Sequence, residues 1–361
     1  MKEHKTRQGI LALAGFLVIQ ATQGTQVYGK DANLSVPSSN AIPNGAAVKQ
    51  SDATVDGDRN QVTAPRSRHI GLALTLAGGG ARGAAHIGVL KVLEAAGIRP
   101  DFVSGSSIGA MIGGLYAAGV PVSEIERLAL SGELKKAYFP ANRKMQAVSY
   151  FAPYLLARAV GIHPQIGLYS GKSISKFVSN HLPKGITKIE DMPIPFSAAA
   201  VDLTTTKAVW LSKGSIADAI RASNSMPGFY RPVKVGEQVL VDGGVRENLP
   251  TEIAKAQGAP IVVAVRLQAY LEKVDQKEYN SVMNYGDRVD SILLSEIENK
   301  AVDKADILIE PKIPWMKMTS FKKEELQSAI KAGEIAATKA LPKLRAYEAE
   351  QAMHASTTNP I

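Results

Sequence analysis

Residues 70–97 read IGLALTLAGGGARGAAHIGVLKVLEAAG and contain the first strand, loop and helix that we predict. The run from Ile70 to Ala77 is nearly all apolar, which predicts a strand buried on both faces. A glycine-rich loop follows at Gly78–Gly83. Small and apolar residues then predict a helix from Ala84 to Ala96, which Gly97 ends. A buried strand, a tight loop and a helix in this order are typical of an α/β fold.

The same order repeats in the next stretch. Phe102 and Val103 predict a short strand that runs into GSSIG (Gly105–Gly109), and small residues predict a helix over Ala110–Ala118. Further elements alternate later: strands at Phe196–Asp202, Lys207–Leu211, Gln238–Val241 and Pro260–Val265, and helices at Ser215–Ser223 and Pro250–Gln257. This alternation predicts an α/β fold with a mainly parallel central sheet flanked by helices.

The N-terminus has the three parts of a secretory signal peptide. Basic residues come first (Lys2, Lys5 and Arg7), an apolar run follows at Ile10–Ile19, and polar and small residues continue through Gly29. This apolar run is too short to span a bilayer core, which needs about 20 residues. We therefore predict a signal peptide over residues 1–29 and an exported protein, periplasmic or secreted. A buried N-terminal helix is the alternative.

The rest of the chain divides by composition. Residues 30–68 are rich in Ser, Asn, Asp, Gly and Pro without a sustained apolar period, which predicts a flexible linker. We expect the core of one catalytic domain over 69–270 and a mostly helical, charged part of the same domain over 271–344. The last helix is predicted near Lys322–Leu341, and residues 345–361 are predicted to form a polar tail.

The composition excludes several kinds of protein. None of the 361 residues is a cysteine, which excludes a disulfide framework, a cysteine zinc site and a thiol nucleophile. The net charge is +9, but the basic residues form no stripe with interleaved aromatics, so we predict no nucleic-acid partner. Weak attraction to an anionic lipid surface and a basic surface without a specific partner both remain open.

GSSIG matches the G-x-S-x-G nucleophile elbow and places Ser107 at its centre. In this sharp strand-to-helix turn the central residue has a strained backbone, and its side chain points out at the top of the sheet. The backbones at the two ends of the motif nearly touch, so both ends must be tiny, as Gly105 and Gly109 are. Ser106 and Ile108 flank the serine. Ser107 is therefore the predicted nucleophile.

The loop GGGARG has two interpretations; it consists of Gly78, Gly79, Gly80, Ala81, Arg82 and Gly83. It satisfies the dinucleotide fingerprint G-x-G-x-x-G, but the acidic residue of that fingerprint belongs at the end of the second strand and Asp101 lies at its start. The loop's amides can instead form an oxyanion hole beside Ser107, with Gly79 and Gly80 as preferred donors. Arg82 supports the loop, binds a lipid phosphate or forms a structural salt bridge.

A nucleophilic serine needs a base, and the histidines are poor candidates. In the order of an α/β-hydrolase triad the histidine comes last, and only His354 lies late enough. It falls in the predicted polar tail. His86 lies in the helix after the glycine loop, where a structural role explains it better.

Asp242 is the better candidate base. It ends the apolar strand of VLVDGG, and the two glycines that follow it, Gly243 and Gly244, allow a close approach to Ser107. A plain Asp-Gly turn, common in hairpins, is the alternative.

Three motifs in this order, GGGARG, GSSIG and DGG, make the chain similar to the patatin-like phospholipase family. Other segments resemble the family too: RGAAHIGVLKVLEAAGI, GLYSGKSISKF, AIRASNSMPGFYRPV, VDGGVRENLP and GEIAATKALPKL. The resemblance covers about His69–Leu344. It implies a three-layer sandwich, a dyad of Ser107 and Asp242, and an oxyanion hole at Gly78–Gly83. It also implies hydrolysis of acyl esters in phospholipids, lysophospholipids or related lipids, without a metal or other cofactor.

Other functions remain open: a nucleotide-dependent oxidoreductase, a non-catalytic lipid-binding module, and a peptidase or carboxylesterase that acts on small substrates with the same dyad. Residues 134–168 interleave basic with aromatic side chains, which predicts either a membrane-facing lid or a packed helical insert. With a lipid substrate we also expect transient contact with a membrane surface.

Overall fold

The computed structural model describes residues 71–140, 167–267, 271, 273, 275–279, 282–314 and 316–357. The predicted signal peptide and linker, residues 1–68, lie outside the described residues, and so does most of the 134–168 stretch. In the described part of the chain, no helix is both long and apolar enough to cross a membrane.

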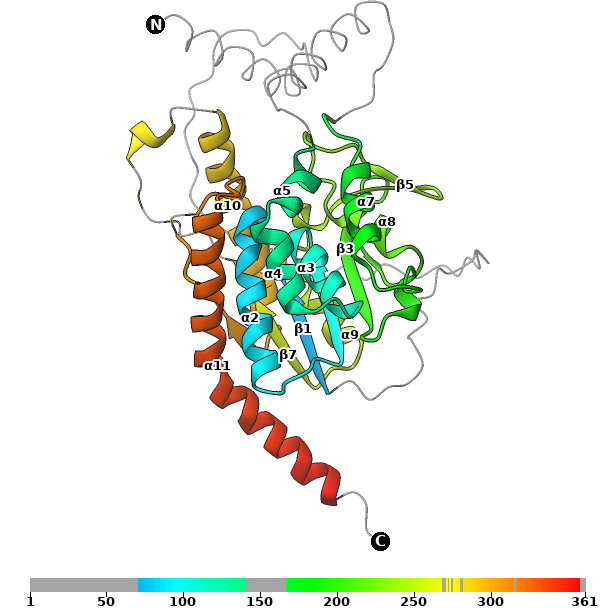
Figure 1. The fold of residues 1–361 in the computed structure, drawn as a ribbon, viewed down its shortest axis with the longest axis vertical. Coiled ribbons are helices and arrows are strands. Elements are labelled where there is room, and N and C mark those ends of the chain that lie inside the picture. Colours follow the sequence, from blue (N-terminus) through cyan, green and yellow to red (C-terminus); the bar gives the residue numbers. More distant parts are fainter. Residues whose placement is uncertain are drawn as a thin grey trace, which may run out of the picture. The chain divides into compact units, whose positions relative to one another are not determined.

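An eight-stranded sheet forms the centre of the described domain (Figure 1). Its order is β5-β6-β3-β2-β1-β7-β8, and β4 pairs with β3 off this path. Strands β3, β2, β1, β7 and β8 run parallel, whereas β4, β5 and β6 pair antiparallel. The predicted α/β fold with a mainly parallel sheet is confirmed. The bounds are β1 Leu72–Leu76, β2 Phe102–Ser106, β3 Phe196–Asp202, β4 Ala208–Leu211, β5 Val233–Val235, β6 Gln238–Asp242, β7 Ile261–Val265 and β8 Ile307–Ile309.

The central parallel strands are apolar along their whole length because both of their faces are covered. Every residue of β1, β2, β3 and β7 is buried. Large side chains such as Leu74 and Leu76 are fully buried, and each stabilises the fold by roughly 2 kcal/mol. The few polar groups are paired: the hydroxyls of Thr75 and Ser104 lie 2.9 Å apart, and Ser104 also donates to the Pro250 carbonyl.

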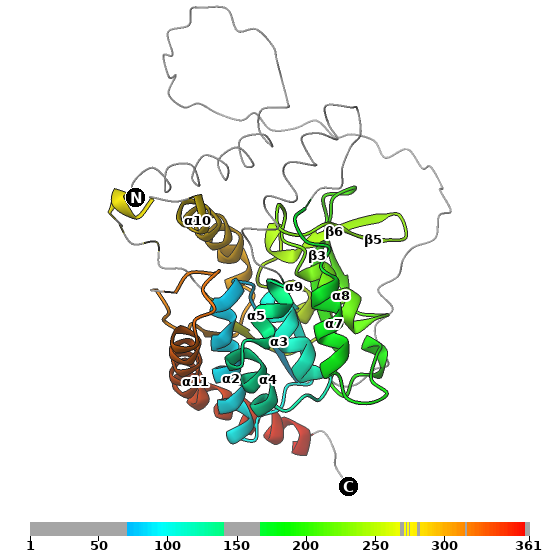
Figure 2. The same ribbon diagram turned by 45° about the horizontal axis from the view of Figure 1, so that its top comes forward.

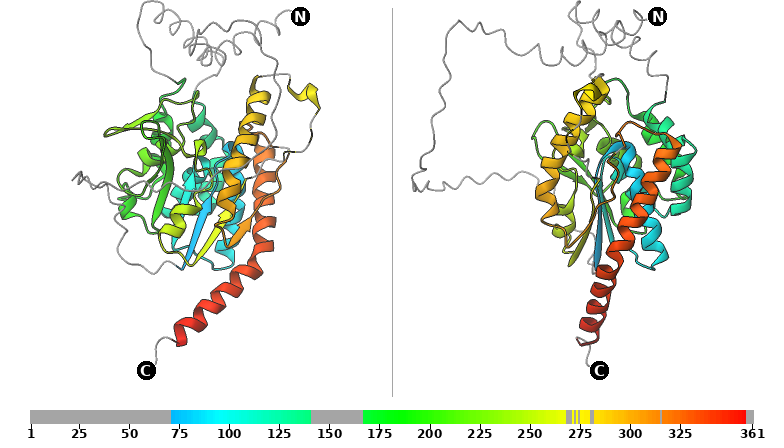
Figure 3. Two further views of the ribbon diagram at one scale, coloured as in Figure 1. Left: turned by 180° about the vertical axis from the view of Figure 1, so that it is seen from behind. Right: turned by 90° about the vertical axis from the view of Figure 1, so that its left-hand side faces the viewer.

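Helices cover both faces of the sheet, and Figure 3 (right) shows the three layers edge-on. On one face α3 packs on β2 and β3, and α2 contacts both α3 and α11; on the other, α9 packs on β1, β2 and β7, with α10 beside it (Figure 2). The bounds are α2 Ala84–Ala95, α3 Ile108–Ala117, α4 Val122–Leu130, α5 Glu133–Tyr138, α7 Lys172–His181, α8 Ile216–Ser223, α9 Thr251–Ala256, α10 Val282–Val302 and α11 Lys323–Thr357.

Helices α2 and α11 touch through two glycines. A Cβ on Gly88 would lie 1.9 Å from the Ile330 carbonyl oxygen, and a Cβ on Gly333 would lie 2.0 Å from the Ala85 carbonyl oxygen. No side chain fits at either position, so the two backbones are in direct contact. Glycine inside a helix costs about 1 kcal/mol relative to alanine. The close packing that it allows offsets this cost.

The final helix is longer than predicted. We predicted a helix ending near Leu341 and a polar tail from residue 345, but α11 continues past Pro342 to Thr357. Leu344, two residues beyond the proline, is fully buried in the core. Its packing outweighs the one hydrogen bond that a proline inside a helix cannot donate. Figure 1 shows that α11 bends in its C-terminal part, as expected of a helix with an internal proline.

Candidate active site

Ser107 lies in the sharp turn between β2 and α3. Its φ of 50° and ψ of −121° fall in a region that non-glycine residues rarely adopt, which is the strain that a nucleophile elbow requires. A Cβ on Gly105 would lie 2.5 Å from Gly109 backbone atoms, and a Cβ on Gly109 would lie 2.2 Å from the Leu76 carbonyl oxygen. The two glycines are therefore required by contact between backbones.

Ser107 and Asp242 are hydrogen-bonded. The Ser107 hydroxyl donates to Asp242 Oδ2 at 2.8 Å, and the Gly244 N–H donates to the other carboxylate oxygen, also at 2.8 Å. Asp242 ends β6, which runs antiparallel to β3 and pairs Asp242 with Ala200. Ser106 pairs with Ala199 on the other edge of β3. The register of β3 with its two neighbours thus brings the serine and the carboxylate together.

Asp242 is 6% exposed, and burial raises the pKa of its carboxyl group from the ordinary 3.8 to about 7. The hydrogen bonds from Gly244 and Ser107 favour the ionised form and oppose this shift. Desolvation dominates because a buried carboxylate loses its hydration. A carboxylate with a pKa near neutrality is a stronger base than an exposed aspartate, and it is still ionised at mildly alkaline pH.

Gly243 allows the loop after β6 to reach the elbow. A Cβ on this residue would lie 2.6 Å from the Ser106 hydroxyl and 2.6 Å from the Ala199 carbonyl oxygen. Residues Gly243–Val245 form a short 3-10 turn, and Asp242 caps it by accepting from the Gly244 N–H. The Asp-Gly-Gly sequence therefore turns the chain directly against the elbow, and Asp242 is not part of a plain hairpin turn.

The glycine loop lies beside the elbow and keeps two amides free. A Cβ on Gly78 would lie 3.1 Å from Ser107 Cβ. Three of the loop's amides are used inside the protein: Gly78 donates to Asn248 O at 3.1 Å, Ala81 to Met318 O at 2.7 Å and Arg82 to Gly79 O at 3.3 Å. Among the described residues, the N–H groups of Gly79 and Gly80 have no acceptor.

The conformation of this loop requires glycine. Gly79 has a φ of 157° and Gly80 a φ of 58°. A Cβ on Gly80 would also lie 2.3 Å from the Met318 carbonyl oxygen. Gly83 is needed for a different reason, since its Cβ would lie 2.3 Å from an Ile108 side-chain carbon. The loop is therefore packed between the segment at Met318 and the first turn of α3.

Arg82 supports the loop, and each nitrogen of its guanidinium group has a hydrogen-bond partner. It is 5% exposed, and its guanidinium donates to the Met316 carbonyl at 2.6 Å, to Ser291 Oγ at 3.3 Å and to Asp287 at 3.3 Å. Asp287 accepts in addition from the Met318 N–H. Arg82 therefore forms a structural salt bridge, with Asp287, and thereby supports the loop. A buried guanidinium with these partners is not placed to bind a lipid phosphate.

A second buried charge network holds the start of the loop. Asn248 Nδ2 donates to the Gly78 carbonyl at 3.3 Å and to Glu298 of α10 at 2.5 Å. Glu298 is 3% exposed and also accepts from Arg266 at 2.9 Å. Burial raises the pKa of Glu298, and its bonds to Arg266 and Asn248 oppose that shift. Helix α10 thus anchors the glycine loop through both Arg82 and Asn248.

Sequence reasoning missed the residues that hold the elbow from the side of α8. Ser223 Oγ accepts from the Ser107 N–H at 3.0 Å, and Asn224 Nδ2 donates to the Ser107 carbonyl at 2.9 Å. The Tyr138 hydroxyl donates to Asn224 Oδ1, and the Tyr230 hydroxyl donates to the Tyr138 carbonyl at 2.6 Å. The segment AIRASNSMPGFYRPV contains three of these four residues, but nothing in its pattern shows what they contact.

Two histidines of the described residues, His86 and His181, and Asp101 have other partners. His86 is fully buried and bonds the Ala77 carbonyl at 2.8 Å; burial lowers its pKa to about 4, so it is neutral and structural. His181 bonds the Phe177 carbonyl. Asp101 accepts from the N–H groups of Gly71 and Leu72, at the amino end of β1. It is therefore at the wrong end of the sheet for a dinucleotide.

No group of three or more metal-ligating side chains occurs among the described residues. The groups that surround Ser107 are one carboxylate, two free amides and a strained backbone. They can take a proton from the serine hydroxyl and stabilise a negative charge on an oxygen next to it. These fold and site features define an α/β protein with a nucleophile elbow and a directly paired carboxylate.

Comparison with known proteins identifies the family. The patatin-like phospholipase family model matches residues 74–255, just over half of the chain. This segment includes the glycine loop, the elbow and Asp242. The chain therefore belongs to the patatin-like phospholipase family.

Individual relatives match over the same region. An uncharacterized NTE family protein of Mycobacterium bovis is 33% identical over 201 residues, which are 54% of this chain and 49% of that protein. Lysophospholipase NTE1 of Yarrowia lipolytica is 33% identical over 216 residues, 60% of this chain and 14% of that protein. This chain thus spans half or less of these relatives' lengths. Among solved structures, VipD of Legionella pneumophila matches 77% of this chain and 67% of its own, with 16% identity and a TM-score of 0.41.

Proposed function

We propose that this protein is a serine lipid-acyl hydrolase that cleaves carboxylic esters of phospholipids or lysophospholipids. The observation that carries the proposal is the 2.8 Å hydrogen bond from Ser107 to Asp242. It lies beside two free amides, in a chain that belongs to the patatin-like phospholipase family. One relative is named a lysophospholipase.

The first half of the reaction forms an acyl-enzyme. Ser107 Oγ attacks the ester carbonyl carbon while Asp242 takes the hydroxyl proton. The Gly79 and Gly80 N–H groups hold the oxyanion of the tetrahedral intermediate, and each such donor contributes about 3 kcal/mol to the transition state. The intermediate collapses, the carbon–oxygen bond to the lipid alcohol breaks, and Asp242 returns the proton to the leaving oxygen.

The second half releases the acid. Water takes the place of the alcohol, gives a proton to Asp242 and attacks the acyl carbon. Collapse of the second tetrahedral intermediate breaks the bond to Ser107 Oγ, which recovers its proton from Asp242. The raised pKa of Asp242 suits a group that accepts and returns a proton in both halves of the reaction.

Two substitutions test the proposal. Ser107→Ala and Asp242→Asn should both reduce phospholipid hydrolysis to near background in protein that stays folded by circular dichroism. Ser107→Ala should also abolish labelling by a fluorophosphonate. Turnover of short esters alone would favour a small-ester carboxylesterase, and full activity in Ser107→Ala would overturn the proposed nucleophile. A folded protein that binds phospholipid without hydrolysing any would favour a lipid-binding module.

We further propose that the outward face of α10 contacts the lipid surface. The face of α10 that packs on the domain is polar, since it carries Asp287, Ser291 and Glu298. Its outward side carries three exposed apolar side chains: Tyr285, Ile292 and Leu293 are 53%, 44% and 55% exposed. Exposed apolar side chains on one face of a helix are typical of membrane-surface contact.

Helix α10 itself lies next to the site. Leu294 on the same helix comes within 3.5 Å of the position that a Cβ on Gly244 would occupy. Changing Tyr285 and Leu293 to Ser should weaken binding to phospholipid vesicles and preserve turnover of a short soluble ester. Leu203→Ser is the matched control, because Leu203 is 49% exposed on another part of the domain. Equal vesicle binding by all variants would contradict the contact.

Export is a separate proposal, supported by the basic start and the apolar run Ile10–Ile19. N-terminal sequencing of the protein from its natural host should find a chain that begins near Thr25–Lys30. Recovery of an intact Met1 from the cytoplasm would contradict export.

A further inference from the structure

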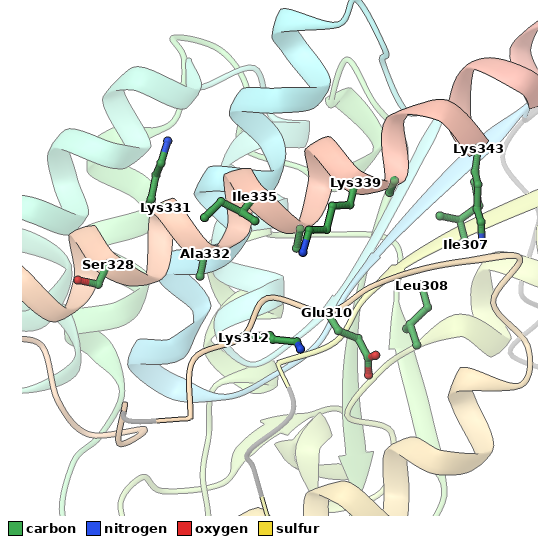
Figure 4. A pocket seen from close by; sticks show the side chains of 12 residues that line it. Ile307, Leu308, Glu310, Lys312, Ser328, Lys331, Ala332, Ile335, Lys339 and Lys343 are labelled. Carbon is green, nitrogen blue, oxygen red and sulfur yellow. The ribbon is translucent and has the colours of Figure 1, made fainter.

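A groove of about 600 Å³ lies on the domain surface away from the active site. It runs between the edge strand β8 and one face of α11, and Figure 4 shows the side chains that line it. In the sheet, β1 and β7 separate β8 from β2, the strand that leads to Ser107. The groove is therefore not a part of the site described above. Its volume lies in the range of about 300–1,000 Å³ that is usual for small-molecule sites.

The floor of the groove is apolar. It is formed by Ile307 and Leu308 of β8 and by Ile335, Ala336 and Ala340 of α11. Ile335 is 50% exposed, although it is a large apolar side chain in a domain that buries most of its isoleucines. The small side chains of the two alanines create the hollow beside it. An apolar hollow in water is unfavourable unless a ligand covers it.

The rim of the groove is positively charged. Lys312, Lys339 and Lys343 line it and form no ion pair with any described residue. The other two charged residues of the groove already have partners: Lys331 pairs with Glu334, and Glu310 lies 3.6 Å from Arg266. Three unpaired cations therefore surround an apolar floor.

We propose that this groove binds a single-chain anionic amphiphile, with the acyl chain on the floor and the head group on the lysines. A carboxylate or a phosphate head satisfies the lysines equally well, so the ligand class includes fatty acids and alkyl or acyl phosphates. The concave shape favours one chain over a flat bilayer. None of the described residues that line the groove is aromatic, which makes a nucleic acid a poor occupant.

Binding can be measured without any catalysis. The full-length Ser107→Ala protein is titrated calorimetrically with dodecanoate, dodecyl phosphate and dodecanol below their aggregation concentrations. A diazirine-bearing dodecanoate then locates the site by photo-crosslinking and peptide mass spectrometry. Because the chain carries Ser107→Ala, the result is independent of whether the protein is a hydrolase.

The expected result is cross-linking within residues 307–312 or 328–343 and affinity for the two anions but not for dodecanol. Lys339→Glu with Lys343→Glu should weaken dodecanoate binding in the groove by about tenfold or more. Ala336→Trp should block it by filling the hollow while leaving all charges in place. Lys234→Glu on β5, an exposed lysine outside the groove, is the control and should bind as the parent does.

Three results would overturn the proposal. Cross-linking confined to other peptides would exclude the groove. Equal affinity for dodecanol would show that the lysines contribute nothing. Equal weakening by Lys234→Glu would show that only the overall charge matters.

Discussion

The side chain of Asn224 holds the backbone of Ser107: the Asn224 amide donates to the Ser107 carbonyl at 2.9 Å. The same amide donates to the Ile220 carbonyl at 2.8 Å, so one side chain ties the elbow to α8. Ser223 accepts from the Ser107 N–H on the other side of the residue. A strained residue persists only where its surroundings fix it, and these bonds do so at the nucleophile.

Asn224 variants should therefore lower kcat more than they change KM. Asn224→Asp keeps the shape of the side chain and removes both bonds that its amide donates, to Ser107 and to Ile220. Loss of the bond to Ser107 alone is worth about 1 kcal/mol, or roughly fivefold in rate. Tyr138→Phe removes the hydroxyl that bonds Asn224 and should have a smaller effect in the same direction. Asn180→Ala, at an exposed position of α7, is the control. A change in KM alone would argue against positioning.

Activity should depend on the ionisation of Asp242. Because burial raises the pKa of this carboxyl group to about 7, the base is mostly protonated at pH 6 and mostly ionised at pH 8. The rate on a soluble ester should rise with pH through about 7 and then level off. A full pH–rate profile checks this. A flat profile from pH 5 upward would mean that Asp242 titrates like an exposed aspartate.

The same pKa predicts a stability effect with a defined sign. A carboxyl group whose pKa is higher in the folded state holds its proton longer there, so its contribution to stability falls as pH rises from about 4 to about 7. Asp242→Asn cannot ionise and can still accept from Gly244. The variant should therefore unfold at a higher temperature than the parent at pH 8, and the difference should vanish near pH 4. Thermal unfolding of both proteins at the two pH values measures it.

The parent protein must be measured beside the variant, because the ionisation of His86 changes stability with pH in the opposite direction. Burial lowers the pKa of His86 to about 4, so its contribution to stability is lost as pH falls from about 6.5 to 4. This effect is common to both proteins and cancels in the difference. A variant that is less stable than the parent at pH 8 would contradict the prediction.

The contact between α2 and α11 gives a prediction on stability alone. Gly333→Ala should destabilise the domain by roughly 1–3 kcal/mol or more, because the new Cβ would lie 2.0 Å from the Ala85 carbonyl oxygen. Alanine is the better helix former, so helix propensity predicts a gain in stability at this position whereas packing predicts a loss. Denaturant unfolding measures the change.

Gly286→Ala on α10 is the matched control. A Cβ at this position meets no atom within 4 Å, so helix propensity alone should act and stability should stay equal or rise by up to about 1 kcal/mol. Similar effects of the two substitutions would show that the helices can separate enough to accept a side chain.

Local sequence patterns located the elements that position the site. The apolar run before Gly78 predicted β1, and the short strand before GSSIG predicted β2, since a strand buried on both faces has no polar positions. The sequence did not reveal β5 and β8, which have three residues each and no pattern of their own. It also placed the end of the last helix at Leu341, because the packing of Leu344 behind Pro342 is a long-range effect.

The sequence by itself determined which chemical groups are available: a serine between two glycines, an aspartate before two glycines, and a loop of glycines with free amides. Each follows from the conformations that a short stretch of chain can adopt. Only the tertiary structure decided how these groups meet. The register of β3 pairs it with Ser106 on one edge and Asp242 on the other, although Ser107 and Asp242 are 135 positions apart. Burial at that junction, which no local pattern contains, raises the pKa of Asp242 to about 7.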